Sequence, residues 1–450
     1  MQSKSVITVL GAGYVGLATA ALFAQAGFRV YVVEPNKERL DTIKQGRSFF
    51  YEEGLDSVIE LGIKSGSLLP TDSYEESVPK SDIVFSCVGT PDNPDGSSNL
   101  TYVFDAAKTA AKLMKPGTVY AQKSTVPVGT GSQIQQLFAG MCVDIDYVSN
   151  PEFLREGTAL ADTLFFDRVV VGGESSAAID AVIDAYRDLE DHRDHIAHIA
   201  RVPVAVQGDQ YIATTLNSAE LIKVTSNAFL ALKISFANSI AMLADKANAD
   251  VIEVMDAVGA DRRIGRSFLN AGRGYGGGCF PKDVSGLISS ALEYGVDLEI
   301  MHAAQNLNNQ MPGYIVDKLQ DELGESLNGK RVAVLGLAFK AGTSDVRKSP
   351  GVAMANKLSY AGAEVITYDP EAREEAAPDL LNHILQAETI DSAIENADIV
   401  LLATEWRQII DYPATLLAEK MSGSILFDAI NQYDALEAQR AGLTYIGVGR

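Results

Sequence analysis

The chain has 450 residues, 47% of them hydrophobic, which is typical of a globular protein with two or three domains. Its net charge of −22 argues against nucleic acid or anionic membranes as partners, because both would repel it. Three scattered cysteines do not form a disulfide scaffold, and no secretory segment or apolar run of about 18 residues is evident. These features favour a cytoplasmic location.

The first motif is a glycine turn between an expected strand and helix. An apolar run at 6–10 leads into GAGYVG at 11–16, helix formers follow, and a second strand at 29–33 ends at Glu34. This order predicts a dinucleotide site, in which the pyrophosphate approaches the helix N-terminus and the acid accepts from the ribose hydroxyls. The alternative is a merely tight turn. Because Glu34 would repel a 2′-phosphate, the motif favours NAD over NADP.

Two further parallel strands are expected at 81–88 and 118–122. Gly89 and Thr90 follow the first, and Ser124 and Thr125 follow the second, so these residues should face the cofactor at the carboxyl edge of the sheet. The alternative for each hydroxyl is a cap on a turn or on the next helix. Cys87, inside the first strand, and Cys142, in an apolar run, are expected to be core residues.

A short strand at 146–149 is followed by NPEFLREG at 150–157. Its two carboxylates, Glu152 and Glu156, are four residues apart and are either site residues or solvated surface charges. The polar stretch 188–198 carries His192, His195 and His198, but steps of three rotate the third histidine away from the first. We therefore expect surface there and no metal site.

Residues 212–258 contain neither glycine nor proline and predict one long helix, or two in succession, as a spine between domains. Lys223 and Asn227 are one turn apart and share a face, which suits an oxyanion site or, alternatively, a surface pair. Four arginines follow and are expected to form a basic patch for an anionic substrate: Arg262, Arg263, Arg266 and Arg273.

The segment 268–283, FLNAGRGYGGGCFPKD, is called the glycine loop here. Its five glycines predict a backbone wrapped closely against something, since they remove the Cβ atoms that keep a chain at a distance. Cys279, followed by Lys282 and Asp283, is either an activated nucleophile or a small buried hydrophobic residue.

A second strand, turn and helix begin at 331, without the third glycine of the fingerprint. Lys340, Arg347 and Lys348 are the expected phosphate partners of this unit. The predicted fold class is α/β, with two Rossmann-like parallel-sheet domains joined by a long central helix. The expected divisions are 1–211 for NAD, 212–323 for the helical spine and cysteine loop, and 324–450 for a second nucleotide.

Taken together, the chain resembles the nucleotide-sugar 6-dehydrogenases of the UDP-glucose/GDP-mannose dehydrogenase family. The resemblance covers essentially the whole chain through seven motifs in the family's order: GAGYVG, VGTP, STVPVGT, NPEFLREG, AELIKVTSNAFLALKISFANSIA, GYGGGCFPKD and AFKAGTSDVRKSP. It implies four-electron oxidation of a sugar C6 alcohol to a carboxylate with two NAD+, through a thioester on Cys279.

The resemblance also implies roles for individual residues. Lys223 and Asn227 would stabilise the oxyanion, Thr125 and Asp283 would position a water molecule, and Glu152 would be the base for thioester hydrolysis. The residues implied to bind NAD are Gly11, Gly13, Tyr14, Val15, Gly16, Glu34, Lys37, Gly89, Thr90, Ser124, Thr125, Glu156, Lys282 and Arg347. Those implied to bind the sugar nucleotide are Glu152, Phe153, Leu154, Lys223, Asn227, Phe268, Tyr275, Gly276, Phe339, Lys340 and, from a neighbouring subunit, Arg263, so at least a dimer is expected.

One position departs from the family pattern. Where many members carry Asp-x-Arg-Asn, this chain has Asp428-Ala429-Ile430-Asn431, and Ile430 offers no guanidinium to a diphosphate. The resemblance favours UDP-glucose as the substrate, with GDP-mannose or a UDP-N-acetylhexosamine as alternatives. A non-catalytic nucleotide-sugar binding protein is the alternative of another class, although it would have no use for Cys279, Lys223, Asn227, Thr125 and Asp283 together.

Overall fold

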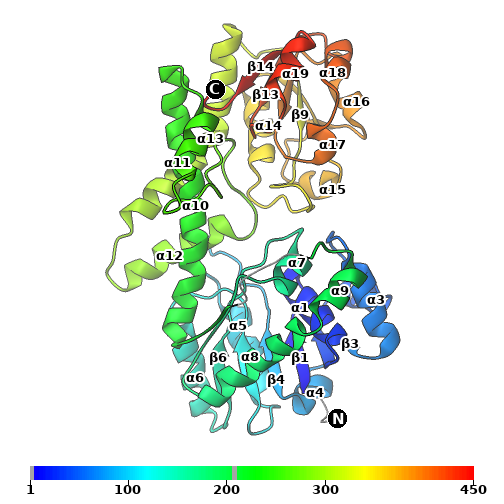
Figure 1. Ribbon diagram of the computed structural model, residues 1–450, viewed down its shortest axis with the longest axis vertical. Helices are drawn as coiled ribbons and strands as arrows, with labels where there is room; N and C mark the ends of the chain where they lie inside the picture. Colours follow the sequence, from blue (N-terminus) through cyan, green and yellow to red (C-terminus); the bar gives the residue numbers. More distant parts are fainter. Residues whose placement is uncertain (1–4, 205–209) are drawn as a thin grey trace. The chain divides into compact units, whose positions relative to one another are not determined.

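The structure is a computed structural model that describes residues 5–204 and 210–450. The chain divides into two compact units, the N-terminal unit Met1–Ser226 and the C-terminal unit Asn227–Arg450. Each unit contains one sheet with helices on both faces (Figure 1). The expected central segment, 212–323, is therefore shared between the two units.

The N-terminal unit is built on an eight-stranded sheet with the order β3-β2-β1-β4-β5-β6-β7-β8. The strands are parallel except where β7 runs antiparallel to β6. The three strands predicted after the first two are confirmed as β4 to β6, whereas β3, β7 and β8 carried no recognised signal. The strands are β1 (Val6–Leu10), β2 (Arg29–Val33), β3 (Leu68–Thr71), β4 (Ile83–Ser86), β5 (Val119–Gln122), β6 (Asp146–Ser149), β7 (Arg168–Gly173) and β8 (Gln210–Thr214).

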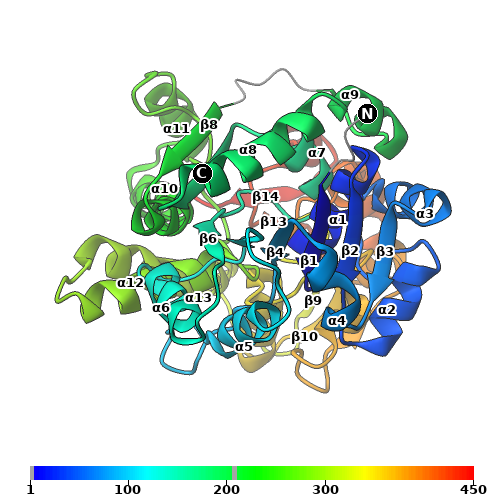
Figure 2. The ribbon, with the colours of Figure 1, turned by 90° about the horizontal axis from the view of Figure 1, so that it is seen from below.

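Alternate residues of these strands enter two separate cores, one on each face of the sheet. Helices α1, α3, α7, α8 and α9 pack on one face, and α5 and α6 pack on the other (Figure 2). The helices are α1 (Tyr14–Gln25), α2 (Lys37–Lys44), α3 (Leu55–Ser65), α4 (Tyr74–Ser77), the 3-10 helix η1 (Val78–Lys80), α5 (Thr101–Ala111), α6 (Thr130–Gly140), α7 (Ala159–Leu164), α8 (Ser176–Glu190) and α9 (Arg193–Ala200).

The C-terminal unit contains a six-stranded, wholly parallel sheet with the order β11-β10-β9-β12-β13-β14. Its strands are β9 (Arg331–Leu335), β10 (Glu364–Tyr368), β11 (Leu385–Gln386), β12 (Ile399–Leu402), β13 (Ile425–Asp428) and β14 (Thr444–Gly447). Helices α13 and α14 share one core with the sheet, and α16, α18 and α19 share the other. The helices after the spine are α12 (Phe280–Glu293), α13 (Glu299–Leu323), α14 (Pro350–Tyr360), α15 (Arg373–Ala376), α16 (Ile390–Ile394), α17 (Arg407–Ile410), α18 (Ala414–Lys420) and α19 (Ala435–Arg440).

The predicted spine consists of two helices, α10 (Leu216–Ala247) and α11 (Val251–Gly259). Asn248 takes a left-handed conformation with φ of 53° between them, and the Asp250 side chain caps α11. The fold class is thus confirmed: two α/β units with parallel sheets, and a 32-residue helix that crosses the boundary between them.

The expectation that no long apolar run is present needs a correction. Helix α10 is long and apolar enough to cross a membrane by length and composition, with a mean hydropathy of 1.4 over 18 residues. Only 44% of that window is buried, but a core helix of a soluble protein passes the same test. Lys223 and Lys233 also lie on this helix, so its composition alone decides nothing.

Candidate active site

The glycine turn of the N-terminal unit has the geometry that a dinucleotide requires. Gly11 has φ of 89°, and a Cβ at Gly16 would lie 1.9 Å from the carbonyl oxygen of Gly11. Around Gly13 a Cβ would meet no atom within 4 Å, so the backbone is open to a ligand there. Helix α1 begins at Tyr14 with neither an acidic residue in its first turn nor a side-chain cap from the described residues. A helix N-terminus without an acidic residue suits a phosphate, because the positive end of the helix dipole points toward it.

Glu34 ends β2 beside this turn and is 5% exposed. Its carboxylate accepts hydrogen bonds from the backbone N–H groups of Ala12, at 3.3 Å, and Asn36, at 2.9 Å. A carboxylate has about four lone-pair sites, so two remain for ribose hydroxyls. These residues fit a bound NAD. Lys37 begins α2 directly beyond and is exposed.

The loops after β4 and β5 are tied to each other by Ser124. Its hydroxyl donates to the carbonyl oxygen of Val88 at 2.6 Å, so this predicted cofactor contact also has a structural role. A Cβ at Gly89 would meet nothing within 4 Å, which leaves the backbone open to a ligand. Thr90 and Thr125 lie half-buried on the same two loops.

Glu152 follows β6, is half-buried and lies near the cations Lys223 and Lys123. Burial raises the pKa of the Glu152 carboxyl, although Lys223, Lys123 and a hydrogen bond from the Leu154 N–H at 3.0 Å lower it. A carboxyl with a raised pKa holds a proton more readily, which suits the predicted general base. Phe153 lies between two cations, with the Arg168 guanidinium 3.8 Å and the Lys223 ammonium 5.3 Å from its ring centre.

The second lysine near Glu152, Lys123, was not predicted. It is 4% exposed, and its ammonium donates to the Tyr186 hydroxyl at 2.7 Å. Tyr186 in turn donates to the Asn150 side-chain oxygen at 3.0 Å. The signal available in the sequence was a lysine at the end of a buried strand, immediately before Ser124.

Glu156, predicted to help hold NAD, is 8% exposed in the loop that follows Glu152. Two backbone N–H groups at the end of this loop, from Gly157 at 2.8 Å and Ala159 at 2.6 Å, donate to the carboxylate of Glu52. Arg155 forms an ion pair with Asp162 at 2.6 Å. The loop that carries the two predicted glutamates is therefore held at a fixed place in the N-terminal unit.

In the C-terminal unit, Cys279 is exposed and occupies the N-cap position of α12. The positive end of the helix dipole stabilises a negative charge at this position. One turn later, the Asp283 carboxylate, 3% exposed, accepts from the Asn227 side-chain nitrogen at 2.6 Å and from Lys282 at 2.6 Å. The structure thus brings three predicted residues together beside the cysteine's helix.

Lys223 and Asn227 lie one turn apart on α10 and are 5% and 7% exposed. Their burial disfavours the alternative of an ordinary surface pair, because a cation and an amide lose hydration there.

The five glycines of the glycine loop pack against protein atoms of the same unit. A Cβ at Gly278 would lie 2.3 Å from the Arg347 guanidinium, and one at Gly277 would lie 2.7 Å from the Phe339 ring. One at Gly276 would lie 2.4 Å from the carbonyl oxygen of Lys348. Three predicted ligand-binding residues of the turn after β9 are therefore in direct contact with the loop that ends in Cys279.

Two aromatic residues of the loop contact Phe280, the first residue of α12. Ring centres are 6.1 Å apart for Phe268 and 6.0 Å apart for Tyr275. Tyr275 is 7% exposed within a small core, and burial raises the pKa of its hydroxyl to about 12. Tyr275 therefore supports the loop through hydrophobic packing.

The expectation of a four-arginine basic patch is wrong for Arg273, and acids pair with two of the other three arginines. Arg273 is 6% exposed and donates to the Phe339 carbonyl oxygen at 2.8 Å and to Glu405 at 2.9 Å. Arg266 pairs with Asp256, and Arg263, with a side chain 89% exposed, pairs with Asp261. An acid thus lies beside each of these three arginines. The sequence does not show this, because proximity along the chain does not determine which way long side chains point.

Three further residues singled out in the sequence have protein partners within the C-terminal unit. Arg347 forms an ion pair with Asp345 at 2.6 Å, and the Lys340 ammonium lies 5.7 Å from the Phe339 ring centre. Ile430 is 9% exposed and packs in the core between the sheet and α18 and α19. Its side chain acts as a core residue in this unit.

The expectation that Cys142 is a core residue is also wrong. Cys142 is exposed and has φ of 56°, directly after the end of α6. The chain turns at Cys142, so its side chain is exposed although neighbouring residues in the sequence are apolar. The three histidines at 192, 195 and 198 are exposed, and among the described residues no group of three or more metal-ligating side chains is present.

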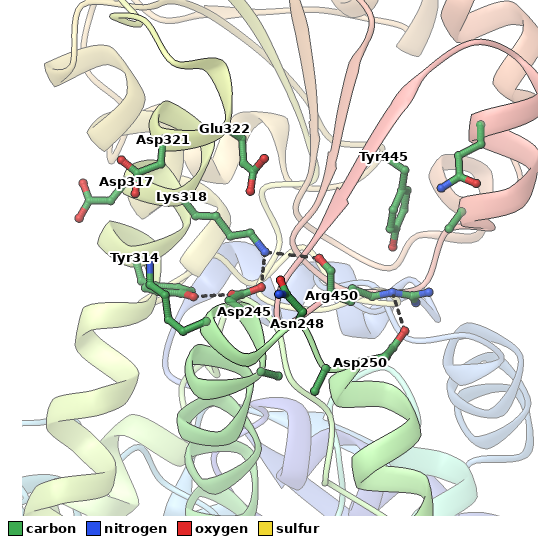
Figure 3. Close-up of a pocket in the computed structure, with 15 residues that line it drawn as sticks. Asp245, Asn248, Asp250, Tyr314, Asp317, Lys318, Asp321, Glu322, Tyr445 and Arg450 are labelled. Atoms are coloured by element: carbon green, nitrogen blue, oxygen red, sulfur yellow. Dashed lines mark hydrogen bonds and ion pairs between the residues drawn. The ribbon is translucent and has the colours of Figure 1, made fainter.

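A cavity of about 720 Å³ lies elsewhere in the C-terminal unit, at the ends of α10 and α13 and beside β14 (Figure 3). Some of its charges lie beside each other: Asp245 accepts from Tyr314 and Lys318, and Arg450 lies 3.4 Å from Asp250. Asp317, Asp321 and Glu322 also line it. It is lined by none of the residues predicted to bind or react. We therefore place the candidate cofactor-binding residues of the N-terminal unit at the glycine turn and in the loops after β4 to β6. The candidate nucleophile of the C-terminal unit lies in the segment around Cys279.

Comparison with known proteins gives consistent results along the chain. Three domains of the UDP-glucose/GDP-mannose dehydrogenase family match: the NAD binding domain at residues 5–190, the central domain at 217–310 and the UDP binding domain at 333–435. The chain is 38% identical over 447 residues to UDP-glucose 6-dehydrogenase YwqF of Bacillus subtilis, covering 99% of this chain and 97% of that one. It is 36% identical over 449 residues to UDP-glucose 6-dehydrogenase of Rhizobium meliloti, covering 99% of both.

Solved structures agree. A UDP-glucose dehydrogenase from Pyrobaculum islandicum is 36% identical with a TM-score of 0.87, covering 100% of this chain and 98% of that one. A UDP-D-ManNAc dehydrogenase from Pyrococcus horikoshii is 26% identical with a TM-score of 0.84, covering 99% of both. The chain therefore belongs to the UDP-glucose/GDP-mannose dehydrogenase family of NAD-dependent nucleotide-sugar dehydrogenases.

Proposed function

We propose that this protein oxidises UDP-glucose to UDP-glucuronate in two successive NAD-dependent steps, with Cys279 as the covalent nucleophile. The observation that carries the proposal is the exposed Cys279 at the N-terminus of α12, one turn before an Asp283 carboxylate bound to Asn227 and Lys282. A nucleotide-sugar dehydrogenase that stops at an aldehyde or ketone has no use for such a thiol. The names of the relatives support UDP-glucose as the substrate.

Bound NAD supplies the hydride acceptor in both oxidations. In the first, C6 of the sugar loses a hydride and its hydroxyl loses a proton, which gives an aldehyde. The Cys279 thiolate then adds to the aldehyde carbon, so a C–S bond forms and the carbonyl oxygen becomes an oxyanion. Lys223 and Asn227, both buried on α10, donate to this oxygen and stabilise its charge.

Loss of the second hydride from C6 turns this adduct into a thioester. A water molecule then adds to the thioester carbonyl and gives up its proton, the C–S bond breaks, and Cys279 leaves as the thiolate. Glu152, whose pKa burial raises, takes the proton of that water, while Thr125 and Asp283 orient the water. The net change is one alcohol, two NAD+ and one water converted to one carboxylate, two NADH and three protons.

The test of the substrate is the number of NADH formed per sugar at completion. UDP-glucose, GDP-mannose and UDP-N-acetylglucosamine are compared in parallel. We expect two NADH from UDP-glucose alone. Two from another sugar would keep the chemistry and change the substrate, and one or none from all three would overturn the proposal.

The test of the nucleophile is Cys279→Ser, with Cys142→Ser as a matched control because Cys142 is also exposed. We expect Cys279→Ser to lose formation of the acid by about 1,000-fold or more, in the range of other catalytic nucleophiles. Rapid quench and mass spectrometry of the wild type should show a sugar adduct on the Cys279 peptide. Normal turnover by Cys279→Ser, together with no adduct in the wild type, would refute the thioester mechanism.

We also propose that the protein works in the cytoplasm, because a reducing compartment keeps cysteines free, and its three cysteines are free.

We propose further that the protein is a homodimer formed through α10. The helix exposes an apolar stripe at intervals of seven or eight residues: Leu221, Phe229, Phe236 and Leu243. Such a stripe is costly to leave in water and is typical of an interface. Light scattering should give the mass of a dimer for the wild type and of a monomer for Phe236→Glu; a monomeric wild type would contradict this part.

A further inference from the structure

Glu220, in the second turn of α10, is a buried carboxylate that is held by two backbone N–H groups. It is 2% exposed, and its two oxygens accept hydrogen bonds from the backbone N–H groups of Gly129 and Gly131, each at 2.7 Å. These partners are about 90 residues away in sequence, at the start of α6. The side chain thus joins two elements of the N-terminal unit through two short, charge-assisted hydrogen bonds.

The turn at the start of α6 is shaped to receive this carboxylate. Gly129 is the N-cap residue of the 11-residue helix, has φ of 93°, and offers no side chain to cap it. A Cβ at Gly131 would lie 3.0 Å from the Glu220 oxygen and 2.8 Å from the Tyr147 ring. The Glu220 carboxylate therefore replaces a capping side chain, at the helix end where a negative charge is stabilised.

The two joined elements carry residues of the proposed mechanism. The turn leads back to Thr125 and Ser124 after β5, and α10 carries Lys223 one turn after Glu220. All of these residues lie in the N-terminal unit. Resting on the proposed function, we propose that Glu220 is a positioning residue that fixes the Ser124–Thr130 turn against the part of α10 that carries Lys223.

The assignment gives Glu220 no contact with a reacting atom. Without the clamp, the turn and the helix are free to shift relative to each other, and a misplacement of about 1 Å in an active site costs about 100-fold in rate. Binding of the nucleotide sugar should change little, because its predicted pocket is lined mainly by residues of the C-terminal unit, such as Phe339 and Lys340.

The experiment compares Glu220→Gln and Glu220→Asp with the wild type, with Glu60→Gln as the control. Glu60 is an exposed glutamate of the same unit that pairs with Lys64 at 2.5 Å. Glutamine keeps the size but turns an NH2 group toward one of the two donors, and aspartate keeps the charge but is too short to reach both. Measurements are made well below the melting temperature of each variant.

We expect kcat to fall about 10- to 100-fold in Glu220→Gln and less in Glu220→Asp, with KM for the nucleotide sugar within about 3-fold of the wild type. Hydrogen exchange of the amides in 124–131 should accelerate in both variants and not in Glu60→Gln. A lower melting temperature with unchanged kcat would show a purely structural role and overturn the proposal, as would unchanged exchange in 124–131.

The two proposals fail in distinguishable ways. If the wild type oxidises no nucleotide sugar, the proposed function is wrong, and hydrogen exchange together with NAD+ affinity still decides the role of Glu220. In that case faster exchange with weaker NAD+ binding supports the clamp, and wild-type values of both refute it.

Discussion

The two sheets of this protein begin with the same arrangement, a strand, a glycine turn, a helix and a second strand that ends in an acid, but the acids do different work. Glu34 in the N-terminal unit accepts two backbone hydrogen bonds. Asp369 in the C-terminal unit accepts five, from four backbone N–H groups and the Trp406 indole. Five donors use the whole acceptor capacity of a carboxylate, so Asp369 is committed to the fold while Glu34 keeps capacity for a ribose.

The glycines show a related contrast. In the N-terminal unit Gly16 packs on the carbonyl oxygen of Gly11, five residues earlier. The C-terminal unit lacks a glycine at that spacing, yet Gly351 packs in the same way on Gly336, where a Cβ added at Gly351 would lie 2.5 Å from the carbonyl oxygen. Between these two glycines lies a long turn that carries Phe339, Lys340 and Arg347. The close strand–helix packing is thus kept, while the short phosphate-binding turn is replaced by one rich in side chains.

The comparison predicts that one architecture supports two modes of nucleotide recognition. Where the turn is short and the acid keeps two acceptor sites, the backbone and one carboxylate should suffice. Where the acid is saturated, recognition should depend on the side chains of the longer turn.

The largest expected effect comes from Gly16→Ala. The new Cβ would lie 1.9 Å from a backbone oxygen, so the helix must move away from the sheet, and we expect a loss of more than about 5 kcal/mol in the free energy of unfolding. Gly13→Ala is the control: with φ of −64° and no atom within 4 Å, alanine fits the fold and obstructs only the cofactor. Urea unfolding and NAD+ titration separate the two, and equal stability of both variants would contradict the packing argument.

The acids provide the next test. Asp369→Asn turns an NH2 group toward backbone donors and should lower the free energy of unfolding by about 4 kcal/mol, because several buried N–H groups lose their acceptor. Glu34→Gln should change stability by less than about 1 kcal/mol and weaken NAD+ binding by about 10-fold or more. Calorimetric titration with NAD+ and urea unfolding measure both; a reversed pattern would refute the division of labour between the two acids.

Glu220 gives a pH dependence that its replacement by glutamine should remove. Burial raises the pKa of Glu220 to about 7, although the N–H groups of Gly131 and Gly129 lower it. The folded state therefore holds this proton more tightly than the unfolded state does, so the contribution is fully present below about pH 4.5 and is lost as pH rises through about 7. The loss amounts to about 3 kcal/mol.

Unfolding of the wild type and Glu220→Gln between about pH 4 and pH 8 measures this contribution as the difference between the two curves. Tyr147 faces Glu220 from β6, but burial raises the pKa of its hydroxyl well above its usual value, so it stays neutral in this range. Parallel curves for the two proteins would contradict the assignment.

The smallest expected effect concerns the thiols. Cys279 and Cys142 are exposed, whereas Cys87 is half-buried and burial raises its pKa to about 12, so Cys87 should be the least reactive thiol. We expect two thiols per chain to react with a disulfide reagent in the native protein and three in urea. Labelling of Cys87 in the folded protein would show that the strand end beside the glycine turn opens to solvent.

The sequence by itself determined the features that depend on short stretches of chain. A short apolar run predicts each of the strands at 6–10, 29–33 and 331–335. The absence of helix breakers predicts the long helix after residue 215, and the glycines themselves allow the conformation of GAGYVG. The fold class and the cofactor site could therefore be predicted before any contact was known.

Only the tertiary structure decided how side chains distant in sequence meet. Phe339 and Arg347 occupy the space beside glycines of the glycine loop, and Arg273 is buried against Glu405. The Asp369 carboxylate accepts its full number of hydrogen bonds, and Glu220 caps a helix about 90 residues away. Such contacts depend on packing geometry, which a local pattern does not encode. The same physical cause explains the errors at Cys142 and at the arginine patch, because burial is a property of the assembled fold.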